Sequence, residues 1–168
     1  MIMPKVIPEY LFAPCSMNCM VCYVHLKKKK PCSGCLGDDI NKPERCKTCT
    51  IKACAITKGH KYCYECSDFP CKTLRNMEKS YIKRYGTSLF KNAQYAKENG
   101  ITGFQKKEHK NWICKKCTGV VSLHDGTCSE CGEKHTDMSD RPVKGNSNTF
   151  VPTLRTASQE EEDGVRDD

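Results

Sequence analysis

Cysteine dominates this sequence: fifteen of its 168 residues are cysteines, and most stand in Cys-x-x-Cys pairs. The pairs constrain the fold because little else could hold the segment from Cys32 to Cys71 together. Ordering a residue costs about 1–2 kcal/mol in backbone entropy, and fully burying a large apolar side chain contributes roughly 1.5–3 kcal/mol. The sizeable aliphatic or phenyl side chains of this segment are only five: Leu36, Ile40, Ile51, Ile56 and Phe69. Cysteine is the one residue present in sufficient number to cross-link the segment.

The cysteines are predicted to bind metal, with redox-active disulfides as the main alternative. A secreted disulfide scaffold would begin with an apolar signal, but the first nine residues contain two prolines, a lysine and a glutamate. The cysteine count is odd, so complete disulfide pairing would leave one thiol over. Paired thiols in a reducing compartment most often coordinate a metal. We therefore expect a cytoplasmic protein, and no membrane association, because no stretch approaches the roughly 18 apolar residues of a membrane span.

Composition divides the chain into four stretches. Residues 1–71 carry eleven cysteines, residues 72–111 none, residues 112–135 the last four, and residues 136–168 are polar and end acidic. We predict a small metal-stabilised α+β protein. It comprises a cysteine-rich domain of metal-binding knuckles and short helices with covering helices (1–111), a small β zinc ribbon (112–135) and a disordered acidic tail (136–168).

The cysteine-free stretch predicts the covering helices. The first opens at Cys71, with Ser67 or Asp68 as its cap, and stops at Gly86. A second helix runs from about Ser88 to Asn99, and Gly100 ends it. A short third helix follows, because Thr102 with Gln105 three residues on forms a capping-box pattern.

The motif Cys-x2-Cys-x4-Cys occurs twice, 17 residues apart, at positions 46, 49 and 54 and at 63, 66 and 71. We interpret each copy as a knuckle followed by a short helix. The third cysteine would lie near the helix start, where backbone amides and the helix dipole favour a thiolate. Gly59 and Gly86 would stop the two helices.

The C-terminal cysteines form the most specific pattern. Two Cys-x-x-Cys knuckles are separated by ten residues, as in a zinc ribbon, and would close a tetrahedral structural site. The predicted ligands are Cys114, Cys117, Cys128 and Cys131. His124 and His135 are possible substitutes, although four thiolates already satisfy the metal, and zinc is favoured over iron.

The other eleven cysteines are predicted to form two or three further sites, dividing as four, four and three. These candidate ligands are Cys15, Cys19, Cys22, Cys32, Cys35, Cys46, Cys49, Cys54, Cys63, Cys66 and Cys71. His25 or His60 could complete the smallest set. The spacing leaves the grouping open, and it also leaves open zinc or [4Fe–4S] as the cofactor. The ferredoxin run Cys-x2-Cys-x2-Cys-x3-Cys-Pro is absent, which lowers the case for an ordinary ferredoxin. The spacing Cys-x3-Cys-x2-Cys of Cys15, Cys19 and Cys22 also occurs in radical S-adenosylmethionine enzymes. Those enzymes surround their cluster with a large partial barrel, and this chain is too short to form one.

The formal net charge of +8 is unevenly distributed. After Thr153 two arginines face six acidic residues, so the tail carries −4 and the rest of the chain +12. A zinc ion held by four thiolates is a −2 centre, so the lysines would offset the metal sites. The excess of basic residues is therefore weak evidence for nucleic-acid binding.

The densest basic spots, Lys27–Lys30 and Lys106–Lys107, are interpreted as solvated faces. Trp112 beside Lys115 and Lys116 could stack on a base, but packing over the zinc knuckle is favoured. No Gly-rich phosphate loop, nucleophile elbow or Ser/His/Asp set is present. The sequence therefore leans away from an enzyme.

Together these motifs resemble a family of small cysteine-rich proteins, a domain of unknown function common in anaerobic bacteria and archaea. The resemblance covers roughly residues 12–110. It rests on Cys15-Ser-Met-Asn-Cys19-Met-Val-Cys22-Tyr23, on Cys32-Ser-Gly-Cys35, on the first Cys-x2-Cys-x4-Cys copy, and on Cys63-Tyr-Glu-Cys66-Ser-Asp-Phe-Pro-Cys71-Lys-Thr-Leu74. Residues 112–134 resemble a zinc-ribbon extension that some members carry. The resemblance implies a metal- or cluster-binding role and a cytoplasmic setting, and no established activity.

The function expected from the sequence is therefore metal binding, with structural metals in an adaptor that acts on an unknown protein partner. Two alternatives stay open: an iron–sulfur redox or cluster-handling protein, and an RNA- or ribosome-associated zinc protein.

Overall fold

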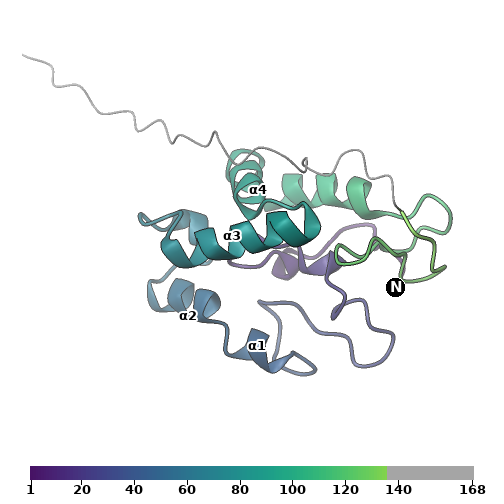
Figure 1. The fold of residues 1–168 in the computed structure, drawn as a ribbon, viewed down its shortest axis with the longest axis horizontal. Helices are drawn as coiled ribbons and strands as arrows, with labels where there is room; N and C mark the ends of the chain where they lie inside the picture. Colours follow the sequence, from purple (N-terminus) through teal and green to yellow (C-terminus); the bar gives the residue numbers. More distant parts are fainter. Residues whose placement is uncertain (136–168) are drawn as a thin grey trace, which may run out of the picture.

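The regular structure of the protein consists of helices (Figure 1). The computed structural model describes residues 1–135, and the predicted disordered tail, residues 136–168, lies outside the described residues. In chain order the elements are the 3-10 helices and α-helices η1 (Glu9–Leu11), η2 (Cys19–Val21), α1 (Glu44–Lys47), α2 (Thr50–Thr57), η3 (Cys63–Glu65), α3 (Lys72–Tyr85) and α4 (Leu89–Trp112). Residues 1–135 contain no strand, only isolated β-bridges. The predicted α+β class is therefore confirmed for its helices and wrong for its strands.

Helix α3 lies close to its predicted bounds. Its N-cap is Cys71 itself, in extended conformation, rather than Ser67 or Asp68. Gly86 ends the helix with a φ of 64°, a left-handed conformation that glycine adopts without the steric cost of a side chain. Leu74 is buried in the main core, and this contact fixes the face that α3 turns inward.

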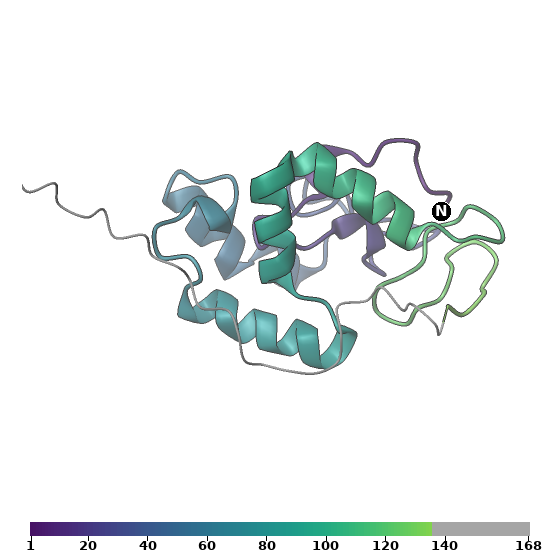
Figure 2. The ribbon, with the colours of Figure 1, turned by 90° about the horizontal axis from the view of Figure 1, so that it is seen from above.

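Helix α4 is bent at Gly100, the residue at which the sequence predicts one helix to end and another to follow. Gly100 has φ 71° and ψ 165°, outside the helical region, and the two arms point in different directions (Figure 2). Ser88 caps the first arm by accepting a hydrogen bond from the backbone N–H of Lys91. The second arm extends to Trp112, further than the short helix that was predicted. Among residues 1–135, no helix combines the length and apolarity needed to cross a membrane.

A buried carboxylate fixes α3 against the start of α4. Ser88 donates a hydrogen bond of 2.5 Å from its Oγ to Glu78 Oε1, and the Leu89 backbone N–H donates one of 2.6 Å to Glu78 Oε2. Both donors lie at the N-terminus of α4, where the helix dipole favours a negative charge. These hydrogen bonds offset the cost of burying the Glu78 carboxylate, and they fix α3 against the start of α4.

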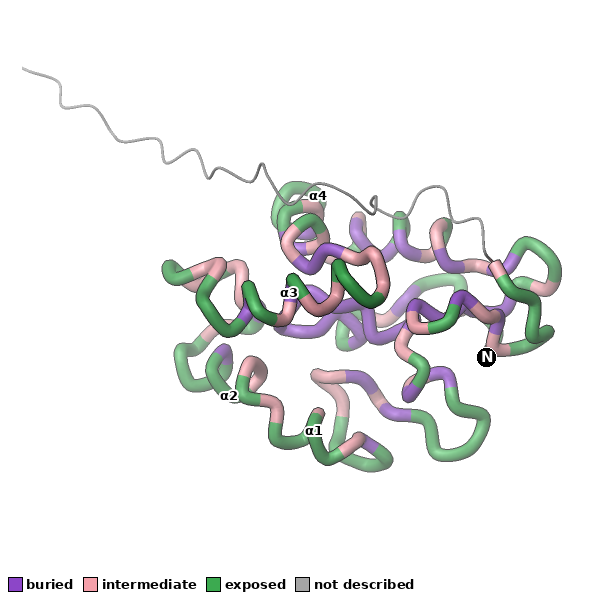
Figure 3. The backbone as a smooth tube through the Cα atoms, viewed as in Figure 1, coloured by how far each residue is buried: buried purple, intermediate pink, exposed green. Residues whose placement is uncertain are grey.

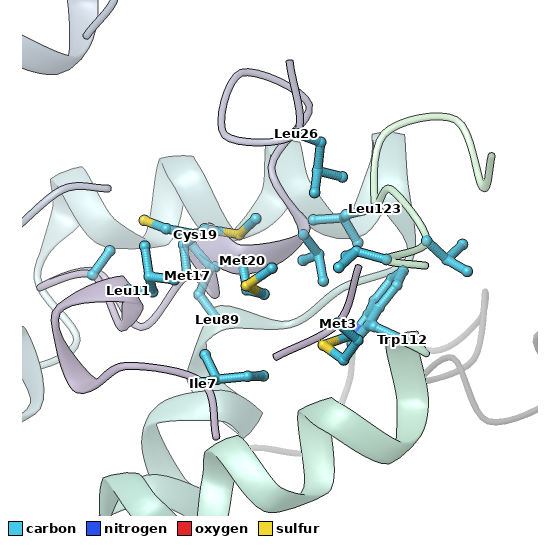
Figure 4. Close-up of a cluster of buried hydrophobic side chains, with 14 of the residues drawn as sticks. Met3, Ile7, Leu11, Met17, Cys19, Met20, Leu26, Leu89, Trp112 and Leu123 are labelled. Carbon is cyan, nitrogen blue, oxygen red and sulfur yellow. The ribbon is translucent and has the colours of Figure 1, made fainter. Parts of the chain in front are cut away.

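The main core forms around the N-terminal segment, which runs through the middle of the molecule as a mostly buried chain (Figure 3). Methionines and aliphatic side chains of this segment meet residues from both long helices and from the C-terminal segment (Figure 4). The cluster includes Met3, Ile7, Leu11, Met17, Met20, Leu74, Leu89, Trp112, Val120, Val121 and Leu123. One apolar core therefore joins the start, the helices and the C-terminal cysteine segment.

Residues 112–135 have the path of a ribbon without continuous strands. The backbone pairs only at single positions, such as Ile113 with Val120 and Val121 with Cys128. The two knuckles and their turns use most of the segment, so few residues remain to extend a ladder. This segment also bonds to the start of the chain, where the Met3 backbone N–H donates to the Thr118 carbonyl over 3.0 Å. The predicted boundary between residues 1–111 and 112–135 stays a prediction, since packing alone does not say whether either part folds by itself.

The two copies of the repeated cysteine motif take different structures. In the first copy Cys49 is the N-cap of α2, so Cys54 lies in the middle of that helix. In the second copy the helix starts only after Cys71. Pro70 explains the delay, because a proline disfavours helical conformation in the residue before it. The prediction that the third cysteine lies near a helix start is confirmed for Cys71 and wrong for Cys54.

Candidate metal centres

The four C-terminal cysteines converge on one point. Their sulfur atoms all lie within 4.8 Å of one another. Cys114 Sγ is 3.8 Å from Cys131 Sγ, and Cys117 Sγ is 3.5 Å from Cys128 Sγ. In a tetrahedral zinc site with Zn–S bonds of about 2.3 Å, the sulfurs stand about 3.8 Å apart. The donor set and its spacing therefore fit a four-thiolate metal ion, whose identity the geometry leaves open.

The four thiols of this cluster differ in how readily they ionise. Burial opposes charge on Cys114, but N–H groups of Lys116 and Cys117 donate to its sulfur, and its pKa is lowered overall. At Cys131 the Glu133 N–H lowers the pKa, but the adjacent thiols outweigh it and raise the pKa to about 12. Like charges packed this closely resist ionising together. A bound metal ion would remove that conflict by neutralising them.

Of the two histidines that the sequence offers as substitute ligands, His124 and His135, only His135 contacts the cluster. His135 Nε2 lies 3.3 Å from Cys114 Sγ. His124 instead packs edge-on against two tyrosine rings, with centroids 4.8 Å from Tyr23 and 4.7 Å from Tyr85. His135 can donate an N–H to the Cys114 thiolate and so orient it, as outer partners of metal ligands commonly do.

Gly119 leaves room for the cluster. A Cβ at this position would lie 2.7 Å from Cys128 Sγ and 2.9 Å from Glu130 Cβ. Real Cβ atoms do not approach so closely, so a side chain here would displace a ligand. The space that this glycine leaves is filled by the Cys128 sulfur.

The eleven N-terminal cysteines are gathered without such convergence. Among residues 1–135, the C-terminal four are the sole group of three or more cysteine, histidine or acidic residues whose ligand atoms all lie within 4.8 Å of one another. Cys15 and Cys19 are buried in the main core, and Cys35 and Cys63 pack against it. Hydrogen bonding with Cys19 is the largest of the effects that lower the pKa of Cys35, to about 7. Cys19 and Cys35 are therefore neighbours, and the hydrogen bond between them favours the thiolate form of Cys35.

Cys22, Cys32 and Cys46 lie within electrostatic range of one another and of Cys35. Backbone amides point at the first two sulfurs, as in metal-binding knuckles: the Gly34 N–H donates to Cys32 Sγ over 3.4 Å. The pKa of Cys22 is raised, mainly by burial, while the N–H groups of Val24 and His25 oppose the rise. The His25 ring nitrogen Nδ1 lies 2.5 Å from the Cys32 carbonyl oxygen, which holds this candidate ligand beside the group.

The last four of the eleven N-terminal cysteines lie on α2, on and just after η3, and at the N-cap of α3. They are Cys54, Cys63, Cys66 and Cys71. No contact places His60 as a ligand in the described residues, so its role stays a prediction.

Trp112 and Lys116, beside the first ribbon knuckle, form contacts within the protein. Trp112 is buried, and its Nε1 donates a hydrogen bond of 2.9 Å to Glu108 Oε2. Lys116 forms an ion pair of 2.8 Å with Glu133. Trp112 therefore acts in the core, which agrees with the favoured packing interpretation over base stacking.

Comparison with known proteins gives one match. Residues 11–76 match the model of a family described as protein of unknown function (DUF3795). No curated protein and no solved structure matches the chain. The matched stretch is shorter than the expected 12–110, but it holds all eleven N-terminal cysteines. The chain thus combines a segment similar to the DUF3795 family with a C-terminal four-cysteine cluster suited to a metal ion.

Proposed function

We propose that the protein is a metal-binding adaptor whose metals are structural and stabilise a surface for a protein partner. The convergence of the Cys114, Cys117, Cys128 and Cys131 sulfurs carries this proposal. Four thiolates complete a tetrahedral shell and leave no open position for a substrate. The cluster also lies where the end of α4, the ribbon and the N-terminal segment meet, so a metal ion there would hold three parts of the chain together.

Metal analysis of the anaerobically purified full chain tests the structural site. We expect at least one zinc ion per chain, and Cys117→Ser should remove one equivalent. Lys115→Ala is the matched control, because Lys115 is exposed inside the same knuckle and offers no ligand atom. Equal metal content in Cys117→Ser and in the unaltered chain would contradict the proposal.

The protein partner is supported by apolar side chains exposed near the start of the chain. Val6 is 72% exposed, Ile2 56% and Tyr10 48%. Contiguous exposed apolar patches are typical of interaction sites, and we propose that these three side chains, close in sequence, belong to one. Replacing Val6 by serine should weaken association with the partner and leave the metal content unchanged. Loss of metal in this variant would show that these residues serve the fold instead.

An iron–sulfur role is the second candidate, and the spacing of the N-terminal cysteines favours it. Cluster ligands bind separate irons, so their sulfurs stand further apart than those around one zinc ion. A brown protein with iron and acid-labile sulfide would support this role. A colourless protein with three or more zinc ions would exclude it.

RNA association is the third candidate, supported only by the basic charge. Phosphate contacts release counterions, so true RNA binding must weaken steeply as salt rises. Absent or salt-independent binding at low salt would remove this candidate.

A further inference from the structure

Three elements bring four cysteines to one end of the molecule. Helix α2 carries Cys54, η3 begins with Cys63 and is followed at once by Cys66, and Cys71 is the N-cap of α3. Both ribbon views place α2 beside the start of α3 at the same end (Figures 1 and 2). The tight turn between Cys63 and Cys66 is closed by a backbone hydrogen bond of 3.2 Å.

Lys58 joins α2 to the loop that carries Cys66. Its Nζ lies 2.5 Å from Asp68 Oδ2 and 3.7 Å from Cys66 Sγ. Its backbone N–H donates to the Cys54 carbonyl over 3.1 Å, so Cys54 lies one helical turn before it. The Lys58 ammonium group therefore contacts one of the four sulfurs, that of Cys66, and its own helix places Cys54 one turn away.

Cys63 joins the group to the core. Its backbone N–H donates to the Pro14 carbonyl over 2.8 Å, and its side chain packs against the main core. Cys63 is half-buried, whereas Cys54 and Cys71 are exposed. Cys63 is therefore the member that the core holds in place.

The fourth sulfur belongs to a helix N-cap. No side chain caps the first turn of the 14-residue helix α3, and a thiolate at Cys71 would lie at the positive end of its dipole. The Lys58 ammonium favours negative charge at Cys66, and the dipole of α3 favours it at Cys71. A four-thiolate centre is strongly anionic, so it requires such compensation.

We propose that Cys54, Cys63, Cys66 and Cys71 form a second four-thiolate metal centre, separate from the ribbon, with Lys58 as its counter-charge. This inference deepens the proposed metal-binding function and rests on it. The centre takes a thiophilic metal, as one zinc ion or as one iron–sulfur cluster. No three of these sulfurs all lie within 4.8 Å of one another, so zinc would require the side chains to close in, whereas a cluster spans a wider set.

The test uses two of the ligands that are exposed, Cys54 and Cys71. The full-length double variant Cys54→Ser, Cys71→Ser removes no core residue, so the main core and the ribbon should stay folded even where residues 54–71 loosen. Zinc, iron and acid-labile sulfide are measured per chain after anaerobic purification. We expect the loss of one zinc ion, or of the iron and sulfide of one cluster, with the metal of the ribbon retained. The matched control is Ala53→Ser, at an exposed position on the same helix.

A second measurement covers the case in which the variant fails to fold. In the unaltered protein, exposed thiols should react quickly with iodoacetamide unless metal holds them. We expect Cys54 and Cys71 to be protected as isolated and to react at least tenfold faster after metal removal. Equal reaction rates before and after removal would overturn the second centre. So would an unchanged metal content in the double variant, or loss of the ribbon metal with it. If the second centre is overturned but the ribbon still binds one metal equivalent, the proposed metal-binding function holds.

Discussion

The two cysteine-rich regions of this protein reach their ligand geometry by different routes. In residues 114–131 two local knuckles suffice, and the sulfurs converge at mononuclear spacing. In residues 15–71 the cysteines come from separate short elements, and neighbours are set by distant contacts such as that between Cys63 and Pro14. The comparison shows that two Cys-x-x-Cys pairs close in sequence specify a site by themselves. Cysteines dispersed along the chain are brought together only by the surrounding fold or by the metal.

Removal of all metal should produce the largest effect and should separate the two regions. The segment from Cys32 to Cys71 contains few buried apolar residues, and structural zinc in small domains contributes on the order of 10–16 kcal/mol. We expect chelation to unfold this segment while much of α3 and α4 persists. Hydrogen exchange resolved by peptide would measure this. Equal loss of protection over the whole chain would show that the helices depend on the metal as strongly as the short elements do.

Substitution of a single ribbon ligand comes next in size. Cys114→Ser or Cys131→Ser should unfold the ribbon and leave the metal of residues 15–71 in place. The shared core makes this a demanding test, because Val120, Val121 and Leu123 pack with the N-terminal segment. Metal analysis with circular dichroism measures the outcome. Loss of every metal together would show that the two regions are not independent.

A smaller effect is expected from crowding the ribbon at Gly119. The added methyl of Gly119→Ala would press on Cys128 Sγ, and overpacking of this kind costs typically 1–3 kcal/mol. We expect weaker metal retention in competition with a chelator and no change at the N-terminal cysteines. Gly132→Ala is a useful control, since nothing lies near its missing Cβ and only its left-handed φ of 72° is strained.

Local signals explain what could be predicted from the sequence. Gly86, Ser88 and Gly100 mark helix ends by their own conformational preferences, and the structure follows them. The ribbon ligands were also predictable, because their partners lie a few residues away. The strands were not confirmed, since the knuckles consume the residues that a ladder would need.

Long-range contacts explain what the sequence left out. The place of Cys54 in mid-helix depends on where α2 starts, and the contact of Lys58 with Cys66 depends on a loop that folds back. The only sequence signal for Lys58 is its position four residues after Cys54 on one helix face. The grouping of the eleven N-terminal cysteines depends on such contacts, and the spacing of cysteines in the sequence does not predict them.

Glu108 links the two regions without being a ligand, and it gives the finest test of their coupling. Its carboxylate accepts hydrogen bonds from Asn18 Nδ2, between two N-terminal cysteines, and from Trp112 Nε1, at the entry to the ribbon. Burial is the main cause that raises its pKa. A carboxyl group with a raised folded-state pKa contributes stability at low pH that is lost as pH rises through that value.

The variant Glu108→Gln should remove this pH dependence, because glutamine stays neutral and its oxygen can still accept a hydrogen bond. We expect the variant to gain stability relative to the unaltered protein as pH rises from 5 to 7, in urea unfolding at constant metal loading. A difference between the two proteins that stays the same across this range would show that Glu108 keeps an ordinary pKa. If the metal content of both regions also stays unchanged, the regions communicate through packing rather than through this carboxylate. Loss of metal from both would instead make Glu108 the polar link on which their common geometry depends.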